Sequence, residues 1–444
     1  MPNPTGRNGT AAQECPPDDV LRAAFEQYAK ENGGSGLNSE DQISRLFLDH
    51  KYKIGRNKLF TLRKELGIDS VRKSKKTRSK VEMSQLVVDA KEDDPAGGWG
   101  VDQTKGRLAN KGILVARDDL REILHDHFPE EFDARVAGRK RAEQHRTPLE
   151  AFGPWHQEHS DGHEKLAQQG LRMGDGIHLP IYASKDQWSA FLHSLILLPN
   201  VRNSNAIVHH YLDLVEDRGY KISIQLVTDQ GSEVNEMHKV HERLRREAAP
   251  LYQPPEFPFG VKQSSTKNTP IESFWRWLRD GDGHSVKLIL QNGSASGIFL
   301  PNDAVHMAVF YWLWVPIIQD GLDTYRAYWN NHKIRKSAMK INPSGSCPIN
   351  MFTNPASVNV AAKQCYINVN PKTVAELRIA YGGEEGRSKA YRWVSEEFKF
   401  NADAIYYNLG APERSLSNGW NVFKLMVAKI EELRATGADV GLEM

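Results

Sequence analysis

The sequence predicts an α/β domain with a mixed β-sheet flanked by helices, preceded by an all-α region and followed by a mostly helical region. Two observations lead to this prediction. Over the first 138 residues, hydrophobic side chains recur at three- and four-residue spacing, which is typical of amphipathic helices. Between residues 155 and 344, short β-rich runs alternate with helical patterns, and this alternation is typical of a sheet packed against helices.

The composition indicates a folded protein. With 444 residues, of which 39% are hydrophobic, the chain can bury several cores, whereas its net charge of +2 does not identify a nucleic-acid-binding protein. The three cysteines are widely spaced, which argues against a disulfide framework or a cysteine-based zinc module and predicts a reducing compartment. No secretory signal is expected, because the N-terminus lacks an apolar run after a basic start. The most apolar stretch, 305–318, is too short to span a bilayer and predicts a core helix kinked at Pro316.

The N-terminal 154 residues divide into a tail, two helical units and a linker. Residues 1–16 are rich in Pro, Gly, Asn and Thr and are expected to be a disordered tail. The first helical unit, 17–82, has an amphipathic helix followed by a helix–turn–helix pattern with a basic second helix. The second unit, 83–138, has three helical patterns with a tight turn at Gly112. A basic linker, 139–154, follows.

Two helix–turn–helix patterns in tandem, with basic residues between them, favour DNA binding, although helical bundles of other function share the pattern. The expected buried positions of the first unit are Val20, Leu21, Ala24, Phe25 and Tyr28, then Ile43, Leu46 and Phe47, then Leu59, Leu62 and Leu66. The expected DNA contacts are Arg56, Lys58, Arg63, Lys64 and, in the second unit, Arg117. The run "VRKSKKTRSK" is either a solvated linker or an arm for nuclear import or phosphate contact, and we expect a nuclear protein.

The core region, 155–344, contains the strands. The runs "DGIHLPIYAS" and "WSAFLHSLILL" predict adjacent antiparallel strands. A helix ending near Gly219 comes next, and "KISIQLVTDQG" predicts one alternating strand that ends on an aspartate. The region 345–444 is expected to be mostly helical. Its clearest helix, at 419–435, either packs on the core or pairs between protomers. The inward positions expected on that helix are Val422, Leu425, Met426, Ile430 and Leu433.

Three acidic residues lie where an α/β sheet collects functional groups. Asp229 ends a predicted strand, and Asp161 lies in or just after the first strand. Glu272 opens a helix whose buried stripe contains Ile271, Phe274, Trp275 and Leu278. Converging carboxylates can hold the two divalent ions that phosphoryl transfer needs. Each residue also has a local alternative, because the aspartates can start turns and Glu272 completes a Thr-x-x-Glu capping box.

The segments "HSDGHEKL", "VTDQGSE" and "NTPIESFWRWL" resemble the three catalytic motifs of the retroviral-type integrase core, the RNase H-like fold shared with DDE transposases. The resemblance is closest to eukaryotic integrase-core-domain proteins related to mobile elements. It covers roughly 83–352, and the downstream "WNNHKIRKS" is similar to a motif that follows the core in these proteins. The segment between Asp229 and Glu272 is longer than is typical of retroviral integrases, and tandem helical units stand in place of their N-terminal zinc domain.

The resemblance implies that Asp161, Asp229 and Glu272 are the catalytic residues and the metal ligands. It implies two Mg²⁺ or Mn²⁺ ions and no zinc. A zinc site built from His156, His159 and His163 is not expected, because no cysteines or second cluster accompany them. The cationic side chains that flank Glu272 are candidates for phosphate contacts or for ordinary solvated surface. They are Lys267, Arg276 and Arg279.

The sequence therefore predicts a DNA-binding, divalent-metal-dependent polynucleotidyl transferase of the integrase/transposase type, an endonuclease that also joins strands. Its partners would be DNA and further copies of the chain when two DNA ends are brought together, and no membrane is expected. One alternative is a domesticated, non-catalytic DNA-binding protein that keeps the fold. A further alternative is an RNase H-like nuclease that hydrolyses DNA without joining it.

Overall fold

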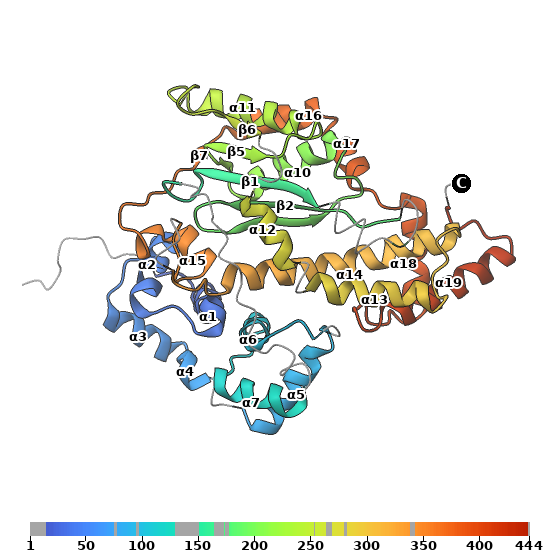
Figure 1. The fold of residues 1–444 in the computed structure, drawn as a ribbon, viewed down its shortest axis with the longest axis horizontal. Coiled ribbons are helices and arrows are strands. Elements are labelled where there is room, and N and C mark those ends of the chain that lie inside the picture. The colour runs from blue at the N-terminus through green and yellow to red at the C-terminus, as the bar shows by residue number, and fades with distance from the viewer. Residues whose placement is uncertain are drawn as a thin grey trace, which may run out of the picture.

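The computed structural model describes residues 15–74, 78–94, 97–128, 151–163, 173, 177–252, 254–262, 269–278, 282–337 and 342–442. Most of the expected tail, most of the basic linker and part of the run at 71–80 lie outside these residues. The long helix α14 (Ala304–Asn331) runs between a β-sheet on one side and the N-terminal helices on the other (Figure 1). Pro316 lies within it, as the sequence predicts. None of the described helices combines the length and apolarity needed to cross a bilayer.

The central sheet is mixed and has five strands in the order β3-β2-β1-β5-β6. These are β1 (Gln157–His163), β2 (Ile181–Asp186), β3 (Leu192–Leu197), β5 (Gln225–Thr228) and β6 (Gly260–Lys262). β1, β2 and β3 are antiparallel neighbours, whereas β1, β5 and β6 run parallel. The predicted antiparallel pair and the mixed sheet are both confirmed, and the arrangement is consistent with the RNase H-like fold.

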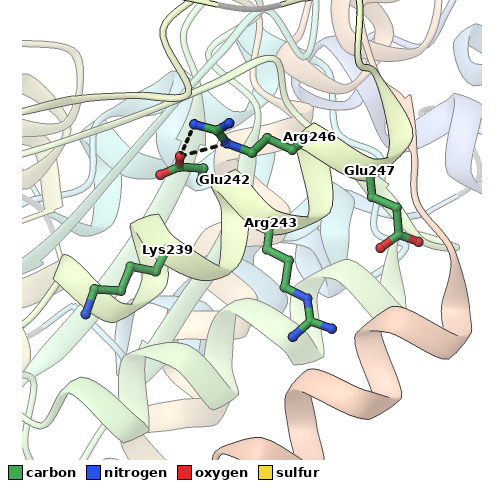
Figure 2. A pocket seen from close by; sticks show the side chains of 5 residues that line it. All are labelled: Lys239, Glu242, Arg243, Arg246 and Glu247. Atoms are coloured by element: carbon green, nitrogen blue, oxygen red, sulfur yellow. Dashed lines mark hydrogen bonds and ion pairs between the residues drawn. The ribbon is translucent and has the colours of Figure 1, made fainter.

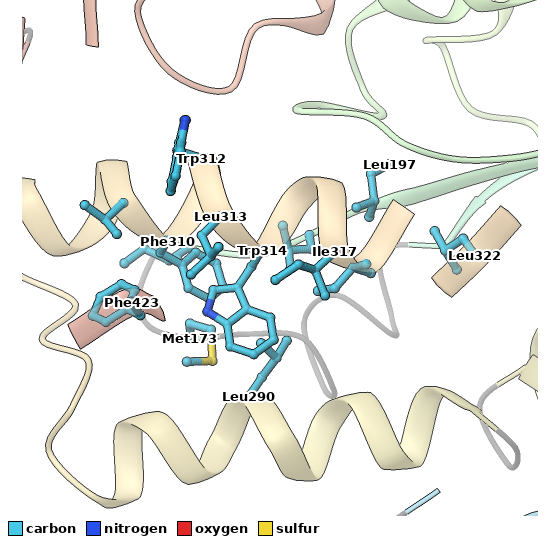
Figure 3. Packing of buried hydrophobic residues seen from close by; sticks show 14 of the residues in the cluster. Met173, Leu197, Leu290, Phe310, Trp312, Leu313, Trp314, Ile317, Leu322 and Phe423 are labelled. Carbon is cyan, nitrogen blue, oxygen red and sulfur yellow. The ribbon is translucent and has the colours of Figure 1, made fainter. Parts of the chain in front are cut away.

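Both faces of the sheet are covered because its strands are apolar on both sides. Along β2, Ile181 and Ala183 face one core and Tyr182 faces another, as the alternation of a strand requires. The first core lies under α12 (Thr269–Leu278) and α14, and Figure 3 shows Leu197 of β3 beside Ile317 and neighbouring residues of α14. The second core lies under α10 (Ser204–Asp217) and α11 (Asn235–Ala248).

The single strand predicted over "KISIQLVTDQG" is two strands. β4 (Lys221–Ile222) pairs with β7 (Ile367–Asn368) in a separate two-stranded sheet, and only β5 joins the central sheet. The break occurs at Ser223, whose buried hydroxyl donates a hydrogen bond to the carboxylate of Glu158 at 2.9 Å. The alternating pattern continues through this point, so the sequence does not mark the change of sheet.

The N-terminal region forms two helical units. The first contains α1 (Asp18–Gly34), α2 (Ser39–His50), α3 (Arg56–Glu65) and α4 (Val71–Ser74). The second contains α5 (Lys80–Lys91), α6 (Val101–Asn110) and α7 (Arg117–His127). Most of the predicted apolar positions lie in the cores of the two units. Val20 is an exception, since it is only half-buried and lies outside the first core. The expectation that Phe47 points inward is wrong: its side chain is 47% exposed, because the adjacent Leu46 occupies the buried position of that turn.

The second helical unit is docked on the core domain through Arg107 of α6. Its guanidinium pairs with the carboxylate of Asp282, and Trp99 donates a hydrogen bond from Nε1 to the same carboxylate at 2.9 Å. The Arg107 guanidinium also lies 5.1 Å from the ring centre of Tyr328 on α14. These contacts join residues far apart in sequence, so the helical units and the core pack as neighbours.

The C-terminal region is mostly helical, as predicted. It contains α15 (Pro348–Thr353), a 3-10 turn η2 (Pro355–Ser357), α16 (Pro371–Ala380), α17 (Gly383–Tyr391), α18 (Glu396–Asn408) and α19 (Gly419–Ala435). α16 and α17 cover α10 (Figure 1). α19 packs on α14, and α13 (His284–Ala295) lies beside it, with Phe423 inside the first core (Figure 3). The inward position expected for Leu425 is wrong, since this side chain is 49% exposed, whereas Leu433 is partly buried.

Candidate active site

Asp161 and Asp229 lie at matching levels on neighbouring parallel strands. The last pair of the β1–β5 ladder joins His159 to Val227, and each aspartate follows its member of that pair by two residues. Side chains alternate between the two faces of a strand, so residues two positions apart point to the same face. Asp161 and Asp229 are therefore expected on the same face of the sheet. Asp161 lies within β1, Asp229 follows the end of β5, and both are half-buried. The topology therefore brings two carboxylates to one edge of the sheet.

Helix α12 reaches this edge through Trp275. The Trp275 indole donates a hydrogen bond from Nε1 to Asp161 Oδ2 at 2.9 Å. Its ring is 2% exposed and packs against Phe274, while the helix as a whole packs on β1 and β2. The sequence places Trp275 in the buried stripe of α12, but nothing in that pattern predicts its hydrogen bond to the first aspartate.

Glu272 lies in the first half of α12, three residues before Trp275. The helix starts at Thr269, at the position that the capping box predicts. The side chains of Glu272 and Thr269 lie outside the described residues, as do Lys267 and Arg279. Residues three apart on a helix share a face, so the backbone position of Glu272 is one turn from the residue that contacts Asp161.

Tyr182 of β2 is buried in the second core, next to the strand that carries Asp161. Burial, followed by the charges of Asp161, Asp229 and Glu233, raises the pKa of Tyr182 well above its usual value. Gly162 packs against the same ring, and a Cβ atom on it would lie 3.4 Å from Tyr182 Cδ2 and 3.2 Å from a Val201 side-chain atom. The glycine after Asp161 therefore gives this edge room to pack. Glu233, which sequence reasoning missed, adds a third carboxylate close to the same tyrosine.

A second group of polar side chains lies beside Asp229. His238 of α11 hydrogen-bonds through Nε2 to Thr228 Oγ1 at 2.8 Å, and burial together with the nearby Lys262 charge lowers the pKa of His238 to about 4. Lys262 ends β6 opposite Thr228 and hydrogen-bonds to the Asn235 side chain. Sequence reasoning also missed Lys262, because β6 is only three residues long and lacks a clear alternation.

The donor set at this edge suits a hard divalent cation. Carboxylate oxygens are the ligands that Mg²⁺ and Mn²⁺ prefer, and two of them come from adjacent strands. Among the residues that the structure describes, no group of three or more His, Cys, Asp or Glu side chains has the arrangement of a metal site. Of the histidines weighed for zinc, His159 is buried and hydrogen-bonds to Gln187, His156 is buried beside Phe152, and the His163 side chain lies outside the described residues.

The predicted DNA-contacting residues have different surroundings. Arg56, Lys58 and Lys64 of α3 and Arg276 of α12 are exposed. Arg63 is half-buried and donates a hydrogen bond to the Asp69 carbonyl at 2.7 Å, and burial lowers its pKa. Arg117, at the start of α7, pairs with Asp102 at 2.9 Å. The exposed residues are therefore the better placed to contact a phosphate.

A surface hollow of about 550 Å³ lies along α11, and neither Asp161 nor Asp229 lines it (Figure 2). It is lined by Lys239, Glu242, Arg243, Arg246 and Glu247. Two of the lining residues form an ion pair with each other, Arg246 with Glu242 at 2.7 Å. A third, Arg243, pairs with Glu376 of α16 at 3.3 Å. The hollow is thus a charged surface between α11 and α16, and the sheet edge is the candidate site.

Comparison with known families gives a match over the central part of the chain. Residues 153–362 match the family model of the integrase core domain, and this range contains Asp161, Asp229 and Glu272. No curated protein matches the chain.

Proposed function

We propose that the chain is a DNA-binding, divalent-metal-dependent polynucleotidyl transferase that cuts DNA and joins strands, because residues 153–362 match the integrase core domain. The observation that carries the proposal is the matched position of Asp161 and Asp229 on parallel strands of that domain. In this proposal Asp161, Asp229 and Glu272 hold Mg²⁺ or Mn²⁺.

The reaction follows from the chemistry of the site. Divalent ions held by the three carboxylates would activate the attacking oxygen and stabilise the leaving oxygen of a phosphodiester. In the first reaction, a water oxygen attacks phosphorus and the bond to the 3′ oxygen breaks, which leaves a 3′-hydroxyl. In the second, that hydroxyl attacks a target phosphodiester and releases a target 3′-hydroxyl. Neither reaction needs a Ser, Cys or Tyr nucleophile, and the residues of the chain bind and orient the reacting groups.

Further parts of the proposal concern partners. Exposed cations on α3 and α12, together with Lys267 and Arg279, would contact DNA phosphates. Joining requires two DNA ends at once, so the active form would contain more than one copy of the chain. Such a reaction on chromosomal DNA would take place in the nucleus, in keeping with the basic run at 71–80.

The role of Glu272 is tested by its glutamine variant. Glutamine keeps the shape of the side chain and still fits a capping box, so α12 should fold. We expect Glu272→Gln to bind Mg²⁺ or Mn²⁺ at least about tenfold more weakly than the parent chain in calorimetric titration, because a charged ligand is lost. Equal thermal unfolding of the two proteins is the control. If both bind metal equally, or neither does, Glu272 is a helix cap and the metal-dependent function is wrong.

Trp275 is expected to position Asp161 for its role. Trp275→Phe removes the indole donor but keeps an aromatic ring in the core, and losing a hydrogen bond to a metal-binding carboxylate typically weakens metal affinity about 10- to 100-fold. We expect weaker Mn²⁺ binding, measured by electron paramagnetic resonance. Phe274→Leu, an adjacent buried aromatic replacement without a donor, is the matched control. If the two variants lose stability alike and retain metal affinity, Trp275 serves packing alone.

A further inference from the structure

The chain after α14 has an unusual charge distribution. Between Asp323 and Glu376 the sequence contains no acidic residue, but it contains seven basic ones: Arg326, Lys333, Arg335, Lys336, Lys340, Lys363 and Lys372. Over the whole chain, 58 basic residues are nearly balanced by 56 acidic ones. A run of positive charge without acidic residues is typical of a surface that binds a polyanion. Such a run can also be a disordered tail, and the two differ in whether the backbone is held by the fold.

The segment is held by the fold at its most basic point. Ile334 pairs with a later part of the chain, since its N–H donates to the Ser346 carbonyl at 3.1 Å and its carbonyl accepts from Gly345 N–H at 2.9 Å. The Ile334 side chain packs on a small core that contains Trp188 and Met351. Because Ile334 is anchored inward, its neighbours Lys333 and Arg335 extend from a fixed backbone.

The cations of this segment are available. Lys333, Arg335 and Lys336 are exposed, and so is Lys363, which follows Ala362 of the same small core. Within the described part of the chain, none of these four side chains forms an ion pair. Elsewhere on the surface, exposed lysines are commonly paired, for example Lys389 with Glu385 at 2.7 Å and Lys399 with Asp403 at 2.8 Å. The segment therefore presents positive charge that the described part of the chain does not neutralise.

The first helical unit adjoins this segment. Cys347, next to Ser346, donates from Sγ to Glu31 of α1 at 3.4 Å, and the same carboxylate pairs with Arg45 of α2 at 3.1 Å. Glu31 itself is fully buried, so it does not place a negative charge on the surface between the two parts. The α2–α3 pair carries the exposed Arg56, Lys58 and Lys64, also free of ion pairs among the described residues.

We infer that Lys333, Arg335, Lys336 and Lys363 form a surface, here called the post-core strip, that binds the phosphate backbone of duplex DNA beside the α2–α3 unit. The strip lies at the start of β1: Asn342 donates to the Gln187 carbonyl, and Gln187 N–H donates to the Gln157 carbonyl. Asp161 is four residues further along β1 than Gln157, so about 13 Å of strand separates these two residues.

The strip fits duplex DNA because phosphates recur at regular spacing and lysine or arginine can meet them without reading a base. The post-core strip would thus bind DNA of any sequence. It would contact phosphates other than the one that reacts. The inference rests on the proposed function, since it takes DNA as the substrate. Its test must therefore separate loss of the strip from absence of DNA binding altogether.

The experiment uses the full chain and measures binding to a labelled 40-base-pair duplex of arbitrary sequence at several salt concentrations, with chelator present. The variant is Lys333→Ala/Arg335→Ala/Lys336→Ala. The control is Lys424→Ala/Lys429→Ala/Arg434→Ala on α19, which removes the same charge from the far end of the molecule. Each lost phosphate contact reduces the slope of log K against log salt by about 0.9. With three cations removed, we expect the slope of the strip variant to fall by about 3 and its affinity to fall at least about tenfold, and we expect the control to match the parent.

The outcomes separate the two proposals. If the parent chain does not bind the duplex, the proposed function fails. If the parent and the strip variant bind with the same slope and affinity, the post-core strip is not a DNA contact, and the proposed function is untouched. If strip and control variants weaken binding equally, the effect is one of total charge and the strip is again wrong. Equal thermal unfolding of all three proteins is required, and it is expected because the replaced side chains are on the surface.

Discussion

Replacing Asp161 or Asp229 with asparagine is expected to abolish DNA cutting. Each substitution keeps the shape of the side chain and removes one of the two carboxylates that the β1–β5 pairing brings to the sheet edge. Groups that act as a unit lose nearly all activity when one is removed, so we expect a loss of at least about 10³-fold for each single variant. The measurement is Mn²⁺-dependent nicking of supercoiled plasmid, followed by joining of a labelled oligonucleotide with a free 3′-hydroxyl.

The matched control for this prediction is Asp217→Asn. Asp217 is exposed at the end of α10, so the same change of charge and shape is made away from the sheet edge. Its activity should equal that of the parent chain. The double variant Asp161→Asn/Asp229→Asn should be no less active than either single variant, because the carboxylates act together. Joining activity that survives in Asp161→Asn or Asp229→Asn would contradict the assignment of these residues.

Much of this edge could be predicted from the sequence because strand ends carry local signals. Asp229 follows an apolar run and precedes a turn, and Asp161 precedes a glycine, so both could be placed near strand ends. That the two strands are parallel neighbours is set by the topology of the whole sheet. The contact of Trp275 with Asp161 joins residues 114 positions apart, and a helical pattern marks the indole only as buried.

The fold was harder to predict where the periodicity of a segment does not determine which of its apolar residues are buried. Phe47 and Leu425 each extend an apolar stripe, yet a helix buries only the part of its stripe that meets a partner, and both are exposed. The alternation through Ser223 reads as one strand, but its hydroxyl turns inward to a buried carboxylate, and the chain changes sheet there. Neither result can be predicted from neighbouring residues alone. The exposure of Phe47 and Leu425 depends on which elements pack against their helices, and the change of sheet at Ser223 depends on a carboxylate of another strand.

That buried carboxylate, Glu158, leads to the largest expected effect on stability. Arg218 of the turn after α10 donates two hydrogen bonds to Glu158, each at 2.8 Å, and the hydroxyls of Ser184 and Ser223 also bond to it. Glu158 is 1% exposed. Removing one partner of a buried ion pair leaves the other charge without compensation, which typically costs about 3 to 5 kcal/mol. We therefore expect Arg218→Met to lower the free energy of unfolding by about that amount in urea titration at pH 7.

The pH dependence of this loss distinguishes the ion pair from simple packing. Burial acts to raise the pKa of Glu158, but Arg218 and the other partners outweigh it, so the pKa lies far below its usual range. The pair therefore stabilises the parent chain above the unfolded pKa of Glu158, and this stabilisation is lost as the pH falls through the folded pKa. In Arg218→Met only burial and the hydroxyls remain, and we expect the folded pKa to rise above the unfolded one. The penalty is then present at pH 7 and relieved by protonation at lower pH.

The difference in unfolding free energy between parent and Arg218→Met should consequently shrink between pH 7 and pH 4. The control is Arg218→Met/Glu158→Gln, which removes both charges and keeps a hydrogen-bonding side chain for the two serines. It should be more stable than Arg218→Met at pH 7, because an uncharged amide costs less to bury than an unpaired carboxylate. A loss that is the same at both pH values and is not relieved in the double variant would mean that Arg218 acts by packing alone. Since Glu158 lies three residues before Asp161 on β1, the same pair also fixes the strand that carries the first candidate carboxylate.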